Sequence, residues 1–146
     1  MPRPPTPPSA PTPCVVAIND DATFLTMLSE MLALRGYACR TILHRDLERA
    51  LAGLRAEAPA AIILDVRLGH PEEGWAVRDR LKGDPVLGVV PLIMCSADAR
   101  ALERRAKELA AAGDAILPKP FVMGDLFALL TCILAGQGPT DPTSAE

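Results

Sequence analysis

The segment AAIILD at residues 60–65 contains five apolar residues in a row, followed by an aspartate. No polar side chain interrupts the apolar run, which is typical of a strand buried on both faces of a parallel sheet. Four other short segments are strand-like, and amphipathic stretches separate them. These segments are CVVAI (14–18), YACRT (37–41), VVPLIMC (89–95) and AILP (115–118). Five strands that alternate with helices predict a doubly wound α/β domain with helices on both faces of the sheet.

The helices are predicted from apolar residues that recur at helical spacing. Phe24, Leu28 and Leu32 mark the first helix, which we expect to end at Gly36. One helix is expected after each of the remaining strands. Their markers are Leu47, Ala50, Leu51 and Leu54; the segment 75–82; Leu102, Ala106 and Leu109; and Met123, Leu126, Phe127, Leu130 and Ile133.

The two ends of the chain differ in composition from this alternating part. Residues 1–13 contain seven prolines, which predicts a disordered, extended tail without a core. Residues 136–146 are polar and rich in turn formers, which predicts a flexible C-terminal tail. The folded domain is therefore expected over 14–135, with no effector domain after Ala135.

Charge and hydropathy exclude several classes of function. The net charge is −3, and no run of Lys and Arg alternates with aromatic residues, so direct binding to nucleic acid or to an anionic membrane is not expected. No stretch reaches the roughly 18 apolar residues of a membrane span, and no secretory signal is present, which predicts a cytoplasmic protein. The cysteines are scattered without a Cys-x-x-Cys pair, which argues against structural zinc.

Polar residues follow four of the five predicted strands. Their positions place them at the edge of the sheet where the carboxyl ends of parallel strands meet. Carboxylates that crowd together there repel one another unless a cation lies between them, and oxygen ligands suit a hard divalent ion such as Mg²⁺. The residues are Asn19, Asp20 and Asp21 after the first strand, Asp65 after the third, Ser96 after the fourth and Lys119 after the fifth.

In this pattern the sequence resembles the receiver domains of response regulators, the CheY-like superfamily. That family has an acidic pair, a phosphoacceptor aspartate, a Thr or Ser and a Lys-Pro after strands 1, 3, 4 and 5. The corresponding segments here are NDD (19–21), LDVRL (64–68), CSA (95–97) and PKPF (118–121). The resemblance covers the whole predicted domain. It implies a flavodoxin-like fold with five strands in the order 2-1-3-4-5 and a cis Lys119–Pro120 peptide, and Pro118 independently favours an edge position for the fifth strand.

The resemblance also implies a role for each residue of the site. Asp65 would accept a phosphoryl group, with Ser96 and Lys119 contacting the phosphoryl oxygens. Asp20, Asp65 and the backbone carbonyl of Arg67 would hold Mg²⁺, to which Asn19 would contribute weakly or through water. Such a protein is a signalling receiver that assists its own phosphotransfer and dephosphorylation. It is not an enzyme in the ordinary sense.

The partners follow from the same resemblance. A sensor histidine kinase or a histidine phosphotransfer protein would supply the phosphoryl group in two-component signalling. A downstream protein, which the sequence does not identify, would read the phosphorylated state. A homodimer through the fourth helix, the fifth strand and the fifth helix is a further expectation. We therefore expect a single-domain response regulator that acts as a phosphate relay, a sink or a binding switch.

Three positions depart from the family pattern. Asn19 replaces the first acidic residue, which predicts weaker Mg²⁺ binding. Gly69 stands where the family usually has proline, in a loop about one residue longer. Ile116 occupies the position of the aromatic residue whose rotamer commonly reports phosphorylation, so we expect a local switch that begins at Ser96.

Two other functions remain as alternatives. A pseudo-receiver scaffold would bind protein partners without phosphorylation, and the residues at positions 19 and 116 favour it. Retention of Asp65, Ser96 and Lys119 favours the phosphorylated receiver instead. A flavin carrier on the same fold is disfavoured because DDATF (20–24), rather than a loop rich in Gly, Ser or Thr, follows the first strand.

Overall fold

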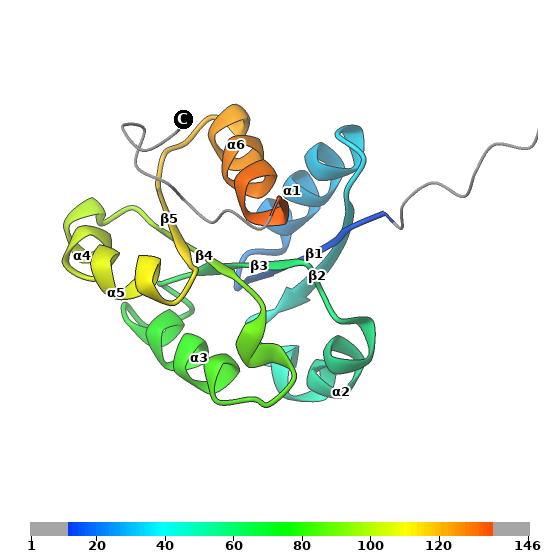
Figure 1. The fold of residues 1–146 in the computed structure, drawn as a ribbon, viewed down its shortest axis with the longest axis horizontal. Helices are drawn as coiled ribbons and strands as arrows, with labels where there is room; N and C mark the ends of the chain where they lie inside the picture. Colours follow the sequence, from blue (N-terminus) through cyan, green and yellow to red (C-terminus); the bar gives the residue numbers. More distant parts are fainter. Residues whose placement is uncertain (1–11, 136–146) are drawn as a thin grey trace, which may run out of the picture.

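The five predicted strands form one parallel sheet in the order β2-β1-β3-β4-β5 (Figure 1). The protein is described here by a computed structural model over residues 12–135. The order and the flavodoxin-like fold class predicted from the sequence are therefore confirmed. The strands are β1 (Cys14–Asn19), β2 (Ala38–Leu43), β3 (Ala61–Asp65), β4 (Leu92–Ser96) and β5 (Ala115–Pro118).

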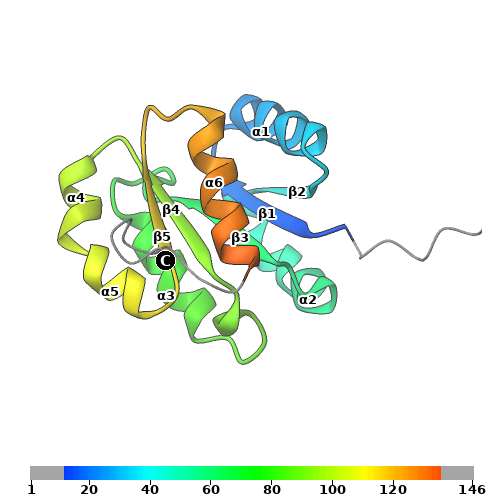
Figure 2. The same ribbon diagram turned by 45° about the horizontal axis from the view of Figure 1, so that its top comes forward.

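Helices cover both faces of the sheet (Figures 1 and 2). Helices α1 and α6 pack on one face, where their leucines join the side chains of Val15, Ala17, Ile63 and Ile93. The other helices pack on the opposite face around Val16, Ile18, Ile62 and Met94. Side chains alternate between faces along a strand, so the central strands β1, β3 and β4 are apolar at every position before the polar residue that ends each of them. The helices are α1 (Ala22–Leu34), α2 (Leu47–Glu57), α3 (Glu73–Lys82), α4 (Ala99–Arg104), α5 (Ala106–Ala111) and α6 (Met123–Leu134), with 3-10 turns η1 (His44–Asp46) and η2 (Leu87–Val89).

The segment after β4 differs from the single helix that the sequence predicts. Arg105 has φ −111° and ψ 6°, and this departure from helical geometry divides the segment into α4 and α5. The Arg105 guanidinium lies 4.1 Å from the centroid of the Trp75 ring and donates hydrogen bonds to both carboxylate oxygens of Glu108. The break thus coincides with a side chain that ties this segment to α3.

Strand β4 is also shorter than predicted. Val89 ends the turn η2, and the strand begins only at Leu92. Pro91 has no N–H, but its carbonyl accepts a hydrogen bond from the N–H of Ile62 at 3.0 Å. The apolar run 89–95 therefore includes a connecting turn that hydropathy alone does not separate from the strand.

Strand β5 lies at an edge of the sheet, and the Lys119–Pro120 peptide is cis, as predicted. In the register of the sheet, Asp65 is paired with Cys95, and Ser96 is paired with Pro118. The strands that carry the predicted site residues therefore end at nearly the same level.

The predicted tails lie almost entirely outside the described residues, and the predictions about them stay predictions. Within the described part, the carbonyl of Pro13 accepts a hydrogen bond from the N–H of Ala38 at 3.0 Å. Among the helices of residues 12–135, none has the length and apolar character needed to cross a membrane.

Candidate functional site

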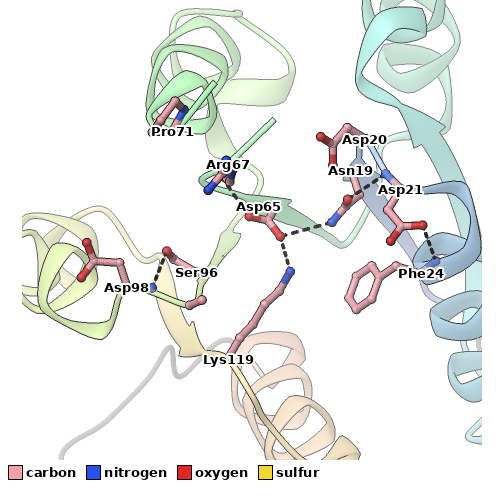
Figure 3. A pocket seen from close by; sticks show the side chains of 11 residues that line it. Asn19, Asp20, Asp21, Phe24, Asp65, Arg67, Pro71, Ser96, Asp98 and Lys119 are labelled. Atoms are coloured by element: carbon pink, nitrogen blue, oxygen red, sulfur yellow. Dashed lines mark hydrogen bonds and ion pairs between the residues drawn. The ribbon is translucent and has the colours of Figure 1, made fainter. Parts of the chain in front are cut away.

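An open cleft of about 490 Å³ lies at the carboxyl ends of β1, β3 and β4, beside the segment that follows β5 (Figure 3). In parallel sheets such ends face a common edge, which brings together residues far apart in sequence. The predicted residues Asn19, Asp20, Asp65, Ser96 and Lys119 all line this cleft. Its other lining residues are Asp21, Phe24, Arg67, Pro71, Ala97 and Asp98.

Asp65 is the last residue of β3, and its carboxylate lies at the centre of the cleft although the residue is only 7% exposed (Figure 3). Its Oδ1 accepts a hydrogen bond from the backbone N–H of Arg67 at 2.9 Å. Its Oδ2 accepts one from Asn19 Nδ2 at 3.3 Å and another from the ammonium of Lys119. These donors compensate the burial of the carboxylate and fix its orientation.

The loop after β3 and the first turn of α3 pack directly on the backbone that carries this carboxylate. Gly74 donates its N–H to the Val66 carbonyl at 2.7 Å, and a Cβ on Gly74 would lie 2.2 Å from the carbonyl oxygen of Asp65. A larger residue at position 74 would therefore displace the end of β3. Gly69 adopts the left-handed φ of +84° and donates its N–H to Asp20 Oδ2 at 3.1 Å. Asp20 thus anchors this loop at the rim of the cleft.

Asn19, the last residue of β1, and the two aspartates that follow it have different roles. The buried Asn19 side chain donates to Asp65, while its Oδ1 accepts the backbone N–H of Asp21 at 3.0 Å. Asp21 Oδ1 in turn accepts the N–H groups of Thr23 at 2.9 Å and Phe24 at 3.2 Å. Asp21 therefore caps α1, which is the ordinary role of an aspartate before a helix.

Ser96 ends β4 and is buried beside Asp65. Its Oγ accepts the backbone N–H of Asp98 at 3.0 Å, and its carbonyl accepts the N–H of Lys119 at 2.8 Å. Asp98 caps α4 through a 3.1 Å hydrogen bond from the N–H of Ala101. The hydroxyl is thus turned toward the loop after β4 rather than toward the carboxylate.

Lys119 reaches the carboxylate from the segment after β5. Its Nζ also lies 4.7 Å from the centroid of the Phe24 ring, a contact that sequence analysis missed. Phe24 was identified only as an apolar helix position, and nothing in the linear pattern signals that its ring faces a lysine 95 residues away. Beneath the site, burial raises the pKa of the Cys95 thiol to about 12, with the nearby Asp65 adding to the effect and Lys119 opposing it. Cys95 is therefore a neutral core residue.

The sequence model of the response regulator receiver domain matches residues 15–131. The chain belongs to this family. The match includes the sheet from its second residue, Val15, and every residue that lines the cleft. This receiver domain is thus a module of two-component signalling.

Individual relatives agree with the family. The transcriptional regulatory protein PrrA of Mycobacterium tuberculosis is 30% identical over 135 residues, which cover 92% of this chain and 55% of PrrA. A response regulator receiver protein from Burkholderia phymatum is 30% identical, with a TM-score of 0.63 over 88% of this chain and all of that one. The chemotaxis response regulator CheY4 of Vibrio cholerae, at 23% identity and a TM-score of 0.68 over 84% of this chain and 99% of that one, shares the fold. The chain spans about half the length of the curated relatives that it matches.

The residues of the cleft could hold Mg²⁺, but only with a small number of protein ligands. Within residues 12–135, no group of three His, Cys, Asp or Glu side chains is arranged to hold a metal. Of the four carboxylates that line the cleft, those of Asp21 and Asp98 cap helices, which leaves those of Asp20 and Asp65 beside Arg67. Mg²⁺ commonly keeps several waters and binds one or two carboxylates, so this smaller set still suits it. The Asn19 amide is uncharged, its N–H₂ points toward Asp65 and its oxygen accepts the Asp21 N–H, so position 19 adds no anionic ligand.

Proposed function

We propose that this receiver accepts a phosphoryl group on Asp65 from a sensor histidine kinase or a histidine phosphotransfer protein. The observation that carries the proposal is the geometry of Asp65. Its carboxylate is held by the Arg67 N–H on one oxygen and by Lys119 on the other, yet it lines an open cleft. A carboxylate is a poor nucleophile unless it is positioned, and phosphoryl transfer is catalysed mainly by placement and by neutralisation of charge.

The transfer forms one bond and breaks one. An oxygen of Asp65 attacks the phosphorus of a phosphohistidine while the P–N bond breaks, and the imidazole of the donor keeps the electron pair. Lys119 neutralises charge on the phosphoryl oxygens, and the Ser96 hydroxyl donates a hydrogen bond to one of them after it turns away from Asp98. Asp20, Asp65 and the Arg67 carbonyl would hold Mg²⁺, which supplies further neutralisation of that charge.

Hydrolysis of the acyl phosphate would return the receiver to its starting state. Water that enters the open cleft attacks the phosphorus, the O–P bond to Asp65 breaks, and inorganic phosphate leaves. The side chains of Arg67 and Asp98 are exposed and line the cleft, so they flank the path of this water. The receiver would in this way limit the lifetime of its own signal.

Incubation with acetyl phosphate and Mg²⁺ tests the proposal directly. We expect a mass gain of one phosphoryl group that is stable in acid, labile in base, and lost with time once acetyl phosphate is removed. Tandem mass spectrometry should place the modification on Asp65. No gain at any Mg²⁺ concentration would reject the proposal.

A pseudo-receiver scaffold is the second candidate, and Asn19 favours it. Its amide donates to Asp65 Oδ2 at the position where the family pattern has an acidic residue. The carboxylate could thus remain permanently hydrogen-bonded without metal or phosphate. If no phosphoryl group were gained from acetyl phosphate even at high Mg²⁺ concentration, that result would support the scaffold function.

The edge of the sheet supports a proposed homodimer of the phosphorylated receiver. The fifth helix of the predicted βα units is α6, and the groove between it and the edge strand β5 is lined mostly by apolar side chains, including Leu117, Pro118 and Leu129. Light scattering with and without beryllofluoride, a phosphoryl mimic, would measure a change in mass. An unchanged monomer in both states would reject the dimer and leave the phosphorylation proposal intact.

A further inference from the structure

The ammonium of Lys119 has two neighbours of different kinds in the cleft. It donates a hydrogen bond to Asp65 Oδ2, and it lies 4.7 Å from the centroid of the Phe24 ring. Figure 3 shows the ring beside the Lys119 side chain, on the α1 side of the cleft. A cation within about 6 Å of an aromatic centroid is attracted by the negative face of the ring. The contact therefore contributes to where the ammonium resides.

A series of hydrogen bonds connects the backbone of Phe24 to the acceptor carboxylate. Asn19 donates to Asp65 at 3.3 Å and accepts from the N–H of Asp21 at 3.0 Å. Asp21 then accepts the N–H of Phe24 at 3.2 Å and caps the first turn of α1. The Phe24 side chain also packs against the apolar cluster between α1, α6 and the sheet. The ring is thus attached to a hydrogen-bonded backbone and packed against the core, in contrast to the long lysine side chain.

The Lys119 ammonium requires a fixed neighbour because other carboxylates in the cleft also attract it. The Lys119 side chain is 27% exposed and has several rotatable bonds. The residue itself follows β5, a strand at the edge of the sheet. Asp20, Asp21 and Asp98 are exposed carboxylates that line the same cleft. An aromatic face attracts the ammonium without consuming any of its N–H donors, whereas a competing carboxylate would consume at least one.

We propose that Phe24 is a positioning residue that holds the Lys119 ammonium on the Asp65 side of the cleft. In the unphosphorylated receiver this keeps an N–H donor on Asp65 Oδ2. On phosphoryl transfer the ammonium must move from the carboxylate to a phosphoryl oxygen, and the ring lets it move without leaving the cleft. This second part rests on the proposed function, whereas the first part does not.

The first measurement uses the unphosphorylated protein. The Lys119 ε-methylene protons lie near the ring face, so their NMR signals should be shifted upfield of those of the other lysines, with assignment from the Lys119→Arg variant. Phe24→Leu keeps an apolar side chain but removes the ring, and should abolish the shift. Phe24→Tyr should retain it. A wild-type signal without an upfield shift, or one that Phe24→Leu leaves unchanged, would overturn the proposal.

The second measurement is the rate of phosphoryl gain from acetyl phosphate. We expect Phe24→Leu to slow it about two- to fivefold, which is the effect of one partly exposed cation–π contact, and Phe24→Tyr to restore it. Phe121→Leu is the matched control, because Phe121 is also a half-buried phenylalanine packed on the same apolar cluster but lies outside the cleft lining. Equal slowing by both leucine variants would overturn the proposal.

A double-mutant cycle separates positioning from a general effect on the fold. If Phe24 acts through Lys119, Phe24→Leu should not slow phosphorylation, or weaken beryllofluoride binding, any further in a Lys119→Met protein. The same fold-change in both backgrounds would contradict the proposal. A wild-type protein that gains no phosphoryl group would instead reject the proposed function, while the NMR measurement would still decide the role of Phe24.

Discussion

Asp114, which precedes β5, and Asp65, which ends β3, are both buried aspartates, and their surroundings differ in a way that separates structure from function. Asp114 is 1% exposed and precedes β5. Its Oδ2 accepts from the Arg78 guanidinium at 3.1 Å, and its Oδ1 accepts from Lys82 Nζ at 2.7 Å and from the Leu92 N–H at 2.9 Å. Two full positive charges and a backbone donor saturate this carboxylate inside the protein.

Asp65 has three donors as well, but only Lys119 among them carries a charge, and the carboxylate lines an open cleft. Asp114 lies at the amino end of its strand, and Asp65 at the carboxyl end of β3, where the polar ends of several strands meet. The same residue type thus clamps the fold at one end of the sheet and stays accessible to a reactant at the other. The comparison predicts that mutations at the two sites affect different properties.

The largest expected effect is the loss of phosphorylation in Asp65→Asn. Asparagine preserves the shape of the side chain but has no carboxylate to attack phosphorus. The mass gain from acetyl phosphate should disappear completely, while the free energy of unfolding should change by no more than about 1 kcal/mol, because Lys119 can still reach solvent. A phosphoryl group on the variant would mean that another residue is the acceptor.

The second prediction concerns stability. Asp114→Ala leaves the Arg78 guanidinium, which is 5% exposed, without its buried counter-charge. We expect the free energy of unfolding to fall by about 3–5 kcal/mol in urea titrations. At temperatures where the variant is folded, it should still gain a phosphoryl group on Asp65.

Glu48→Gln is the control for this prediction. It breaks the exposed pair between Glu48 and Arg80, whose closest N···O distance is 2.6 Å, and should cost at most about 1 kcal/mol. If Asp114→Ala were no less stable than Glu48→Gln, Asp114 would not stabilise the fold in the way that distinguishes it from Asp65.

The third prediction concerns Mg²⁺ binding and the role of Asn19, the uncharged side chain that donates a hydrogen bond to Asp65. Asn19→Asp would replace the amide contact with a second carboxylate facing Asp65, and the repulsion would be relieved by a divalent cation. We expect Mg²⁺ affinity, measured by titration calorimetry, to rise roughly tenfold, or about 1.4 kcal/mol.

Ala97→Asp is the matched control, because it adds the same charge to the cleft lining on the loop after β4 rather than on the strand that pairs with β3. It should change Mg²⁺ affinity much less than Asn19→Asp. Equal Mg²⁺ affinities for wild type and Asn19→Asp would show that the residue at position 19 does not limit metal binding.

The smallest expected effect is the structural change on phosphorylation. Drawing the Ser96 hydroxyl inward would break its hydrogen bond with the Asp98 N–H at the start of α4. Ile116 is half-buried against the apolar cluster and has no ring or hydroxyl to exchange environments. Amide hydrogen exchange with beryllofluoride should therefore change chiefly over residues 96–104. A change centred on 113–120 would contradict this local switch, and Asp65→Asn is the control for specific binding of the mimic.

The sequence was sufficient for the order of the strands and for the polar residues that follow them in the cleft. Uninterrupted apolar runs identified the buried strands, and Pro118 favoured an edge position for β5. The polar residues after the strands were expected at one edge, and the cleft contains every one of them. These features are readable because burial on both faces of a strand and the lack of a proline N–H act at the level of single residues and short segments.

Only the tertiary structure decided how these residues contact one another. The Asn19 amide and the Lys119 ammonium reach Asp65 from 46 and 54 residues away, and their directions depend on strand register and side-chain rotamers. The break at Arg105 coincides with contacts to Trp75 in another helix as well as to the neighbouring Glu108. Asp114 carried no signal in the sequence because an aspartate before a strand is ordinarily a turn residue. Periodicity reports which residues are buried, whereas the partner of a buried charge is fixed only when distant segments pack together.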